Sequence, residues 1–412
     1  MNFLLNVAPF LKDAWEKAGF KEPTKIQDKT IPIINDGEDI IAESPTGTGK
    51  TLAYLLPLLN KIEPNTKQIQ VVILTPTREL AMQIHQVIQT FTQNSEIVSG
   101  SFIGGVDIKR QIDRLKKNPQ IIVGTPGRVM ELIDKKKMKM HEVKTVVVDE
   151  VDQMVEQSLL TEVKVIIQST LKERQVLFFS ATISEKVEEV AKQVMVEPAL
   201  VRVEREATAN VEHLYFVCEQ RDKIDLLRRI YKMNESMKAL IFINDAVHID
   251  RVADKFRYKK IPIGVLHSDA GKKERASAIQ QFRAGTLPLI LATDIAARGM
   301  DIQGLTHVIH LDVPEKIEQY IHRSGRTGRM GATGTVISLV TPSEEKSLLR
   351  FGRELNVTIS KKELYKGEII EQRPVPKKVS TQKPMSKQKP IKKSNDRNFE
   401  FGGPNKKPKA KY

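Results

Sequence analysis

The stretch Ser44-Pro45-Thr46-Gly47-Thr48-Gly49-Lys50-Thr51 follows the apolar run Asp39-Ile40-Ile41 and precedes a helical pattern that begins near Leu52. In a glycine-rich turn of this kind, backbone N–H groups can point at a polyphosphate, and the helix that follows adds the positive end of its dipole. Lys50 would then reach the β and γ phosphates, and the Thr51 hydroxyl would hold Mg²⁺. The stretch therefore predicts a phosphate-binding loop between a strand and a helix.

The first two residues of this loop depart from the general pattern. That pattern has glycine six positions before the lysine, where this chain has Ser44, and Pro45 follows it. A surface turn rich in glycine and threonine is the alternative interpretation. The other motifs of the chain have to decide between the two.

Short apolar runs alternate with helical patterns along two successive parts of the chain. In the first part they cover residues 68–75, 97–103, 120–125, 145–150 and 176–180, and in the second part 214–218, 239–243, 261–267, 287–293, 307–311 and 335–340. Nearly continuous runs rich in β-branched residues are typical of parallel strands covered by helices on both faces. We therefore expect an α/β protein with two parallel-sheet domains.

Changes in composition suggest where these domains end. A charged segment of small residues at 203–211 reads as a linker between a first domain, 1–202, and a second domain, 212–365. From Lys366 to Tyr412 the chain is rich in Lys, Pro, Gln and Ser, with 14 basic and 4 acidic residues. It has too few large apolar side chains to offset the entropy of ordering, so 366–412 is predicted to be a disordered basic tail.

Charge and cysteine content restrict the class of protein. The whole chain of 412 residues carries a formal net charge of +15, which favours a polyanionic partner. The single cysteine, Cys218, rules out an internal disulfide and argues against a thiolate zinc site. We see neither a signal peptide nor an apolar window long enough to span a membrane, so we expect a cytoplasmic protein that has no membrane partner.

Two adjacent acids follow the expected strand at 145–148. In the tetrapeptide Asp149-Glu150-Val151-Asp152, parallel topology would place the acids at the ligand edge of the sheet, beside the phosphate loop. Asp149 could hold Mg²⁺, partly through water, and Glu150 could orient or deprotonate an attacking water. An ordinary solvated turn is the alternative, which the presence of Lys50 and Thr51 makes less favourable.

Taken together, these motifs resemble those of the DEAD-box RNA helicases, over about residues 3–350. The resemblance implies two tandem RecA-like domains, ATP and Mg²⁺ as cofactors, and RNA-dependent ATP hydrolysis. The family's adenine-reading motif is resembled by Gly19-Phe20 and Pro23-Thr24-Lys25-Ile26-Gln27. By this resemblance, Gln27 would hydrogen-bond the adenine edge and Phe20 would pack on the adenine ring. The family's nucleotide-binding residues would here be Phe20, Gln27, Thr46, Gly47, Thr48, Gly49, Lys50, Thr51 and, at the ribose, Asp301.

The same resemblance implies an RNA-contacting set and a coupling set. The RNA set would grip phosphates without reading bases, and comprises Pro76, Thr77, Arg78, Gly105, Thr125, Pro126, Gly127, Arg128, Thr293 and Arg298. The coupling set would link the hydrolysis acids to the other domain, and comprises Asp152, Ser180, Thr182 and His322.

The run Tyr320-Ile321-His322-Arg323-Ser324-Gly325-Arg326-Thr327-Gly328-Arg329 resembles the family's sixth motif. Arg326 and Arg329 are three residues apart, so they would share one face of a helix. The family uses such arginines as fingers that reach the γ phosphate across the cleft. The catalytic set implied for this chain is therefore Lys50, Asp149, Glu150, Arg326 and Arg329.

Val151 stands where the family usually has alanine, so the tetrapeptide reads DEVD. We expect this replacement to affect the rate and tightness of domain closure more than the hydrolysis reaction itself. The expected protein is a bacterial-type, monomeric RNA helicase that acts on single strands or short duplexes. Ribosome assembly, on precursor particles, or RNA turnover would be its setting. A DNA-translocating helicase and a non-catalytic RNA clamp stay open as alternatives.

Overall fold

The structure is a computed structural model that describes residues 7–45, 47–203, 211–234, 236–266, 272–297, 304–328 and 332–371. Seven parallel strands form the first sheet, in the order β3-β4-β2-β5-β6-β1-β7. These strands are β1 (Ile40–Glu43), β2 (Val71–Leu74), β3 (Ser99–Phe102), β4 (Ile121–Gly124), β5 (Thr145–Asp149), β6 (Gln175–Ser180) and β7 (Ala199–Arg202).

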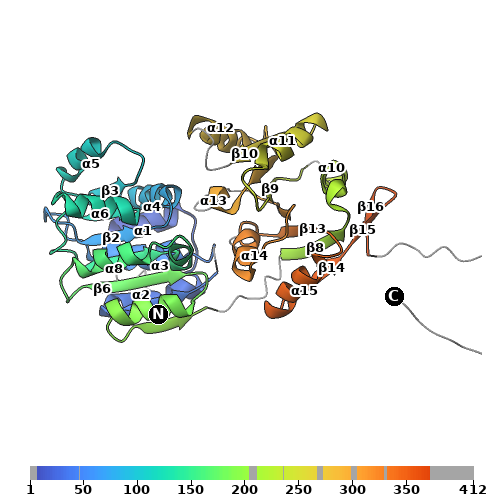
Figure 1. The fold of residues 1–412 in the computed structure, drawn as a ribbon. Coiled ribbons are helices and arrows are strands. Elements are labelled where there is room, and N and C mark those ends of the chain that lie inside the picture. The colour runs from blue at the N-terminus through green and yellow to red at the C-terminus, as the bar shows by residue number, and fades with distance from the viewer. Residues whose placement is uncertain are drawn as a thin grey trace, which may run out of the picture. The chain divides into compact units, whose positions relative to one another are not determined.

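Successive residues of these strands pack into two separate cores, as the alternation of side chains along a strand requires. Ile40 and Ala42 face one core, and Ile41 faces the other. The first core is covered by α1 (Pro9–Lys17), α2 (Lys25–Asp36), α3 (Lys50–Lys61) and α4 (Arg78–Phe91). The second core is covered by α5 (Ile108–Leu115), α6 (Pro126–Asp134), α7 (Val151–Glu156), α8 (Leu160–Gln168) and α9 (Glu185–Val194). The first sheet is thus enclosed on both faces (Figure 1).

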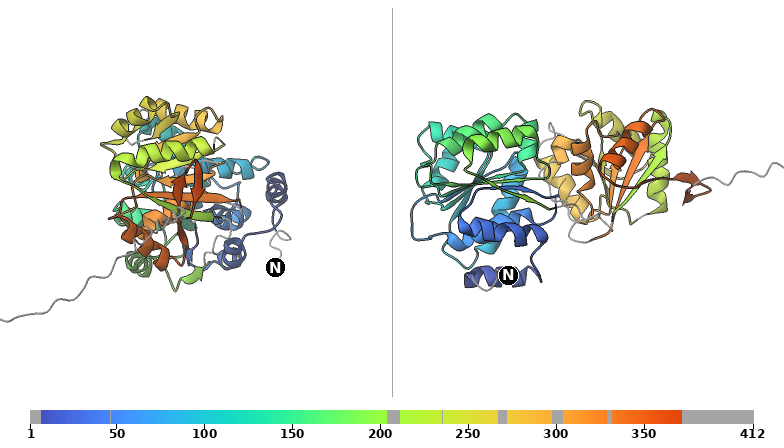
Figure 2. Two further views of the ribbon diagram at one scale, coloured as in Figure 1. Left: turned by 90° about the vertical axis from the view of Figure 1, so that its right-hand side faces the viewer. Right: turned by 90° about the horizontal axis from the view of Figure 1, so that it is seen from below.

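A second seven-stranded parallel sheet has the order β10-β11-β9-β12-β13-β8-β14. Its strands are β8 (Val211–Val217), β9 (Ala239–Phe242), β10 (Ile263–Leu266), β11 (Leu289–Ala292), β12 (His307–His310), β13 (Gly334–Val340) and β14 (Ile359–Lys361). The helices of this part are α10 (Lys223–Met233), α11 (Ile249–Tyr258), α12 (Lys272–Arg283), α13 (Asp294–Ala297), α14 (Ile317–Ser324) and α15 (Glu345–Glu354). Helices enclose the strands of this sheet too (Figure 2).

The two predicted parallel-sheet domains are confirmed, and each predicted strand region contains a strand. Two edge strands, β7 and β14, have no predicted counterpart. The start of the tail was predicted wrongly: β15 (Glu363–Tyr365) and β16 (Glu368–Ile370) form an antiparallel hairpin, so ordered structure passes position 366. The hairpin needs only short strands and a Lys366-Gly367 turn with positive φ at both residues. The rest of the predicted tail, 372–412, lies outside the described residues.

The predicted linker falls largely on residues 204–210, which also lie outside the described part of the chain. Its first residue, Val203, still belongs to the first domain's hydrogen bonding, because its N–H donates to the Glu43 carbonyl at 2.9 Å. Within the described ranges, no helix has the length and apolar character that crossing a bilayer would need.

Candidate active site

Residues 44–45 and 47–49 lie between the end of β1 and the start of α3. Gly47 and Gly49 have φ values of 82° and 94°, the left-handed region that favours glycine. The Ser44 hydroxyl lies 2.7 Å from that of Thr48, and Lys50 Nζ donates to the Ser44 carbonyl at 2.7 Å. Ser44, the departure from the general pattern, therefore braces the loop from within.

The Gln27 side chain connects helix α2 to this loop. Its Oε1 accepts from the Thr24 N–H at 2.9 Å, and its Nε2 donates to the Gly49 carbonyl at 3.2 Å. The amide keeps one lone pair and one N–H, the donor and acceptor that an adenine edge needs. Phe20, the residue predicted to pack on the adenine ring, precedes helix α2 and packs on Trp15, with ring centroids 5.0 Å apart.

Asp149 ends strand β5 and is 3% exposed. Its Oδ1 accepts from the Glu150 N–H and its Oδ2 from the Tyr54 hydroxyl, each at 2.9 Å. Burial raises the pKa of Asp149, and the nearby Lys50 charge and the Tyr54 hydrogen bond oppose that rise. Burial raises the pKa of Tyr54 well above its ordinary value and the Thr51 side chain opposes that rise, so the Tyr54 hydroxyl has polar neighbours in both the acid and the phosphate loop.

Glu150 sits at the N-terminus of α7 in a left-handed conformation, with φ of 54°. A non-glycine residue there carries backbone strain, which is frequent at functional sites. Its Oε2 is buried and has no hydrogen-bond partner among the described residues. Burial raises the pKa of Glu150, while the charge of Arg326 lowers it. A buried, more basic carboxylate of this kind can accept a proton from water.

The Asp152 carboxylate is a junction of hydrogen bonds. Its Oδ2 accepts from the backbone N–H groups of Ala181 and Thr182, both at 3.2 Å, and from His322 Nε2 at 3.1 Å. Burial, the largest influence, raises the pKa of Asp152, but the His322 hydrogen bond and charge, with the Lys50 charge, bring it down to about 2. Ser180 completes the junction by accepting from the Asp152 N–H at 3.2 Å.

The predicted RNA set of the first domain gathers at the carboxyl ends of β2, β3 and β4. Thr77 caps α4 by accepting from the Leu80 N–H at 3.2 Å, and Arg78 lies against Gly104 and Gly105. Arg128 donates to the Val106 carbonyl at 2.9 Å. The other members follow the same strands: Pro76 after β2, and Thr125, Pro126 and Gly127 after β4.

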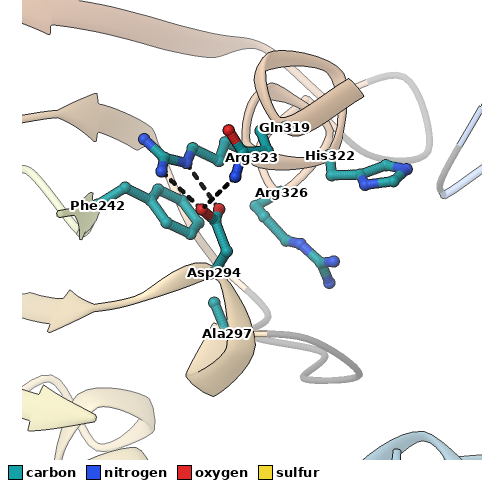
Figure 3. Close-up of a pocket in the computed structure, with 7 residues that line it drawn as sticks. All are labelled: Phe242, Asp294, Ala297, Gln319, His322, Arg323 and Arg326. Atoms are coloured by element: carbon teal, nitrogen blue, oxygen red, sulfur yellow. Dashed lines mark hydrogen bonds and ion pairs between the residues drawn. The ribbon is translucent and has the colours of Figure 1, made fainter. Parts of the chain in front are cut away.

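In the second domain, α14 is fixed by a buried ion pair. Arg323 is 1% exposed and donates to both carboxylate oxygens of Asp294, at 2.7 and 2.6 Å, while its guanidinium lies 5.0 Å from the Phe242 ring centroid. Figure 3 shows His322 and Arg326 pointing away from this ion pair. The pair thus sets which side chains of α14 are turned toward the first-domain acids.

The structure does not describe four of the predicted site residues: Thr46, Arg298, Asp301 and Arg329. Thr293 is described and is buried at the start of α13, where it accepts from the Ala296 N–H at 3.4 Å. In the described ranges, no cluster of three or more His, Cys, Asp or Glu side chains could hold a metal by itself. Asp149 and Thr51 are instead the oxygen donors expected where phosphates complete the shell.

Two buried side chains that contact acids in this region were not singled out from the sequence. Tyr54 follows Thr51 by three positions in a helix, so the two share a face, but a buried apolar helix gives no sign of a hydroxyl contact. The sequence alone assigns no role to Arg323, because its partner Asp294 is brought near only by the packing of α13 and α14.

Two protein-family models match the chain. A model described as "DEAD/DEAH box helicase" matches residues 24–190, and one described as "Helicase conserved C-terminal domain" matches residues 222–331. These two ranges contain the phosphate loop and the acids in the first case and α14 in the second.

The chain is similar to curated proteins over most of its length. It is 56% identical to the DEAD-box ATP-dependent RNA helicase CshC of Bacillus cereus, over 90% of this chain and 96% of that protein. It is 50% identical to the probable ATP-dependent RNA helicase YfmL of Bacillus subtilis, over 87% of this chain and 95% of that protein. Among solved structures it is similar to S. cerevisiae Dbp5 bound to RNA and ADP BeF3, with a TM-score of 0.79 and 29% identity, over 87% and 94% of the two chains.

Proposed function

This chain belongs to the DEAD-box family of ATP-dependent RNA helicases, and on that premise we propose that it uses ATP hydrolysis to bind RNA, separate short duplexes locally and release the strand. ATP would occupy the loop from Ser44 to Thr51, with Gln27 at the adenine edge. Lys50 Nζ has further N–H groups beyond the one given to Ser44, and these would meet the β and γ phosphates.

Magnesium fits the donor set of this site. The Asp149 carboxylate accepts only one hydrogen bond on each oxygen from the described residues, so each oxygen keeps a lone pair. With the Thr51 hydroxyl it offers the hard oxygen ligands that Mg²⁺ takes beside phosphates. When bound, the ion would neutralise charge on the phosphate oxygens during transfer.

Water activation falls to Glu150. Its buried Oε2 would accept the hydrogen bond of a water in line with the γ phosphate and take its proton as attack proceeds. Asp152 would not take that proton, because its pKa of about 2 keeps it ionised. Its role would be to hold the Ser180–Thr182 segment and His322 together.

RNA would enter through contacts with phosphate groups. Thr77, Arg78 and Arg128 present hydroxyl and guanidinium groups at one sheet edge, which suits binding to the backbone without base readout. Arg326, with Arg329, would complete the ATP site when RNA is bound. RNA binding energy would thus assemble the catalyst.

The observation that carries this proposal is the position of Glu150. This carboxylate is the acid influenced both by Lys50 of the phosphate loop and by Arg326, which follows α14. A transferring phosphoryl group needs a positive charge on each side and a proton acceptor for the attacking water. We infer from these influences, and from its buried Oε2, that Glu150 is that proton acceptor.

Substituting the two central residues tests the hydrolysis step. Glu150→Gln should lower RNA-stimulated ATP turnover by about 10² to 10⁴ while ATP and RNA binding are retained. Lys50→Ala should weaken ATP binding as well. Both are measured by ATPase assays with and without RNA and by equilibrium ATP binding, with the exposed Lys116→Ala as a matched control. Wild-type hydrolysis no faster than that of either site variant would instead indicate a non-catalytic RNA clamp.

The choice of nucleic acid is tested by replacing the activator. We expect single-stranded RNA to stimulate hydrolysis and single-stranded DNA of the same sequence to stimulate it weakly, since 2′-hydroxyl contacts distinguish the two. Equal stimulation would favour a DNA-translocating helicase. We further propose that the protein is cytoplasmic and monomeric. We also propose that it acts in ribosome assembly, on precursor particles, or in RNA turnover. Sequencing of the RNA that is crosslinked to the protein in cells would test this role.

A further inference from the structure

The Tyr54 hydroxyl lies between the two residues that are candidates for holding the metal. Tyr54 is on α3 and has no exposed surface. Its hydroxyl donates to Asp149 Oδ2 at 2.9 Å. Thr51 lies three positions earlier on the same helix and therefore on the same face. Burial raises the pKa of Tyr54 and the Thr51 side chain opposes that rise, as a polar neighbour of the hydroxyl does. A phenol group has one proton to donate and lone pairs to accept, so it can serve both neighbours.

Packing fixes the place of this hydroxyl. The Tyr54 ring lies against Phe179 of β6, with centroids 5.1 Å apart and planes inclined by 58°. Both residues belong to the first core, which the α1–α4 side of the sheet encloses. A ring held on all sides cannot swing its hydroxyl elsewhere, so the contact with Asp149 is part of the folded state and needs no ligand to form it.

The Asp149 carboxylate is thereby held at both oxygens. The Glu150 N–H holds Oδ1 and the Tyr54 hydroxyl holds Oδ2, so rotation about the terminal carboxylate bond is restrained. A hydrogen bond to a charged acceptor is stronger than one between neutral groups. Such outer contacts orient a ligand and tune its affinity for a metal.

We propose that Tyr54 is a positioning residue that orients Asp149 and Thr51 for the Mg²⁺–nucleotide complex, so that its hydroxyl couples magnesium binding to nucleotide binding. The inference rests on the proposed use of ATP with Mg²⁺ at this site. The competing interpretation is that Tyr54 is a core aromatic residue whose hydroxyl only satisfies a buried acid. The two differ in what happens when the hydroxyl alone is removed.

The experiment measures the affinity of the full-length protein for a fluorescent ADP, once in excess Mg²⁺ and once in EDTA. Tyr54→Phe keeps the ring and removes the hydroxyl. We expect this variant to bind ADP in EDTA as tightly as the wild type does. The factor by which Mg²⁺ increases its ADP affinity should be about tenfold smaller than in the wild type. The Mg²⁺ concentration at half-maximal ATPase rate should rise by a similar factor.

Two further variants separate positioning from structure. Tyr215→Phe removes a comparable hydroxyl–carboxylate bond, from Tyr215 to Glu345 at 3.0 Å in the second domain, and should leave the Mg²⁺ effect unchanged. When Asp149 is already replaced in Asp149→Asn, adding Tyr54→Phe should cause no further loss of the Mg²⁺-dependent gain in ADP affinity.

The outcomes separate the positioning role of Tyr54 from the proposed metal site. The positioning role would be overturned if Mg²⁺ increased the ADP affinity of Tyr54→Phe and wild type by the same factor, or if Tyr54→Phe lost the same ADP affinity in Mg²⁺ and in EDTA. The proposed metal site itself would be overturned if the ADP affinity of the wild type did not change with Mg²⁺.

Discussion

At the scale of the residue, Asp152 has the clearest electrostatic signature in the site. Four polar groups of the described chain donate to its Oδ2, one of them His322, and the carboxylate is 7% exposed. Asp152 can hold these four donors together only when it is ionised, since a protonated carboxyl group could not accept hydrogen bonds from all four. The family resemblance predicted a coupling set that contains Asp152 and three of its partners here, Ser180, Thr182 and His322. The individual hydrogen bonds, and the Ala181 N–H among them, could be found only from the packing of β6 and α14.

The pH dependence of stability follows from this environment. The pKa of Asp152 is about 2, below its ordinary value of 3.8, so the carboxylate stabilises the fold above that ordinary value. This contribution, about 2 kcal/mol, is lost as pH falls through about 4 toward 2. The free energies of unfolding of wild type and Asp152→Asn, measured in urea, should therefore differ at pH 7 and converge below pH 4. A gap that stays constant down to pH 3 would contradict the assignment.

At the scale of the element, the loop between β1 and α3 depends on close backbone approach. Gly49 has φ of 94°, and a Cβ there would lie 2.6 Å from Gln27 Nε2. The sequence predicted the loop, its lysine and the glutamine. It did not show that Gln27 supports the loop directly, because the contact joins residues 22 positions apart. The brace between Ser44 and Thr48 was equally hidden, since it uses hydroxyls that the general pattern does not require.

Gly49→Ala should therefore damage nucleotide binding more than stability. We expect ATP affinity to fall by at least about tenfold, with a loss of about 1 kcal/mol in the free energy of unfolding. Gly304→Ala is the matched control, because Gly304 has φ of 78° and no described heavy atom lies within 4 Å of a Cβ there. It should lose similar stability and keep its ATP affinity, measured by equilibrium binding and urea unfolding. Equal ATP affinity in both variants would mean that the Gln27 contact does not shape the loop.

At the scale of the whole molecule, the strand pattern was predictable because buried parallel strands leave continuous apolar runs. The edge strands β7 and β14 are less buried, with exposed or half-buried residues, and gave no such run. Membership of the helicase family came from the order of motifs along the chain. The buried Arg323–Asp294 pair required the fold, because neither residue's partner can be read from spacing.

The central claim is that Arg326 of the second domain completes an ATP site whose phosphate loop and acids lie in the first domain. The direct measurement is the ATPase rate of Arg326→Ala at saturating ATP, with and without saturating RNA, beside Arg221→Ala, an exposed arginine of the same domain. The account predicts that Arg326→Ala loses about 10³-fold or more of the RNA-stimulated rate, keeps its ATP affinity, and that Arg221→Ala matches the wild type. An RNA-stimulated rate in Arg326→Ala within a few-fold of wild type would contradict it.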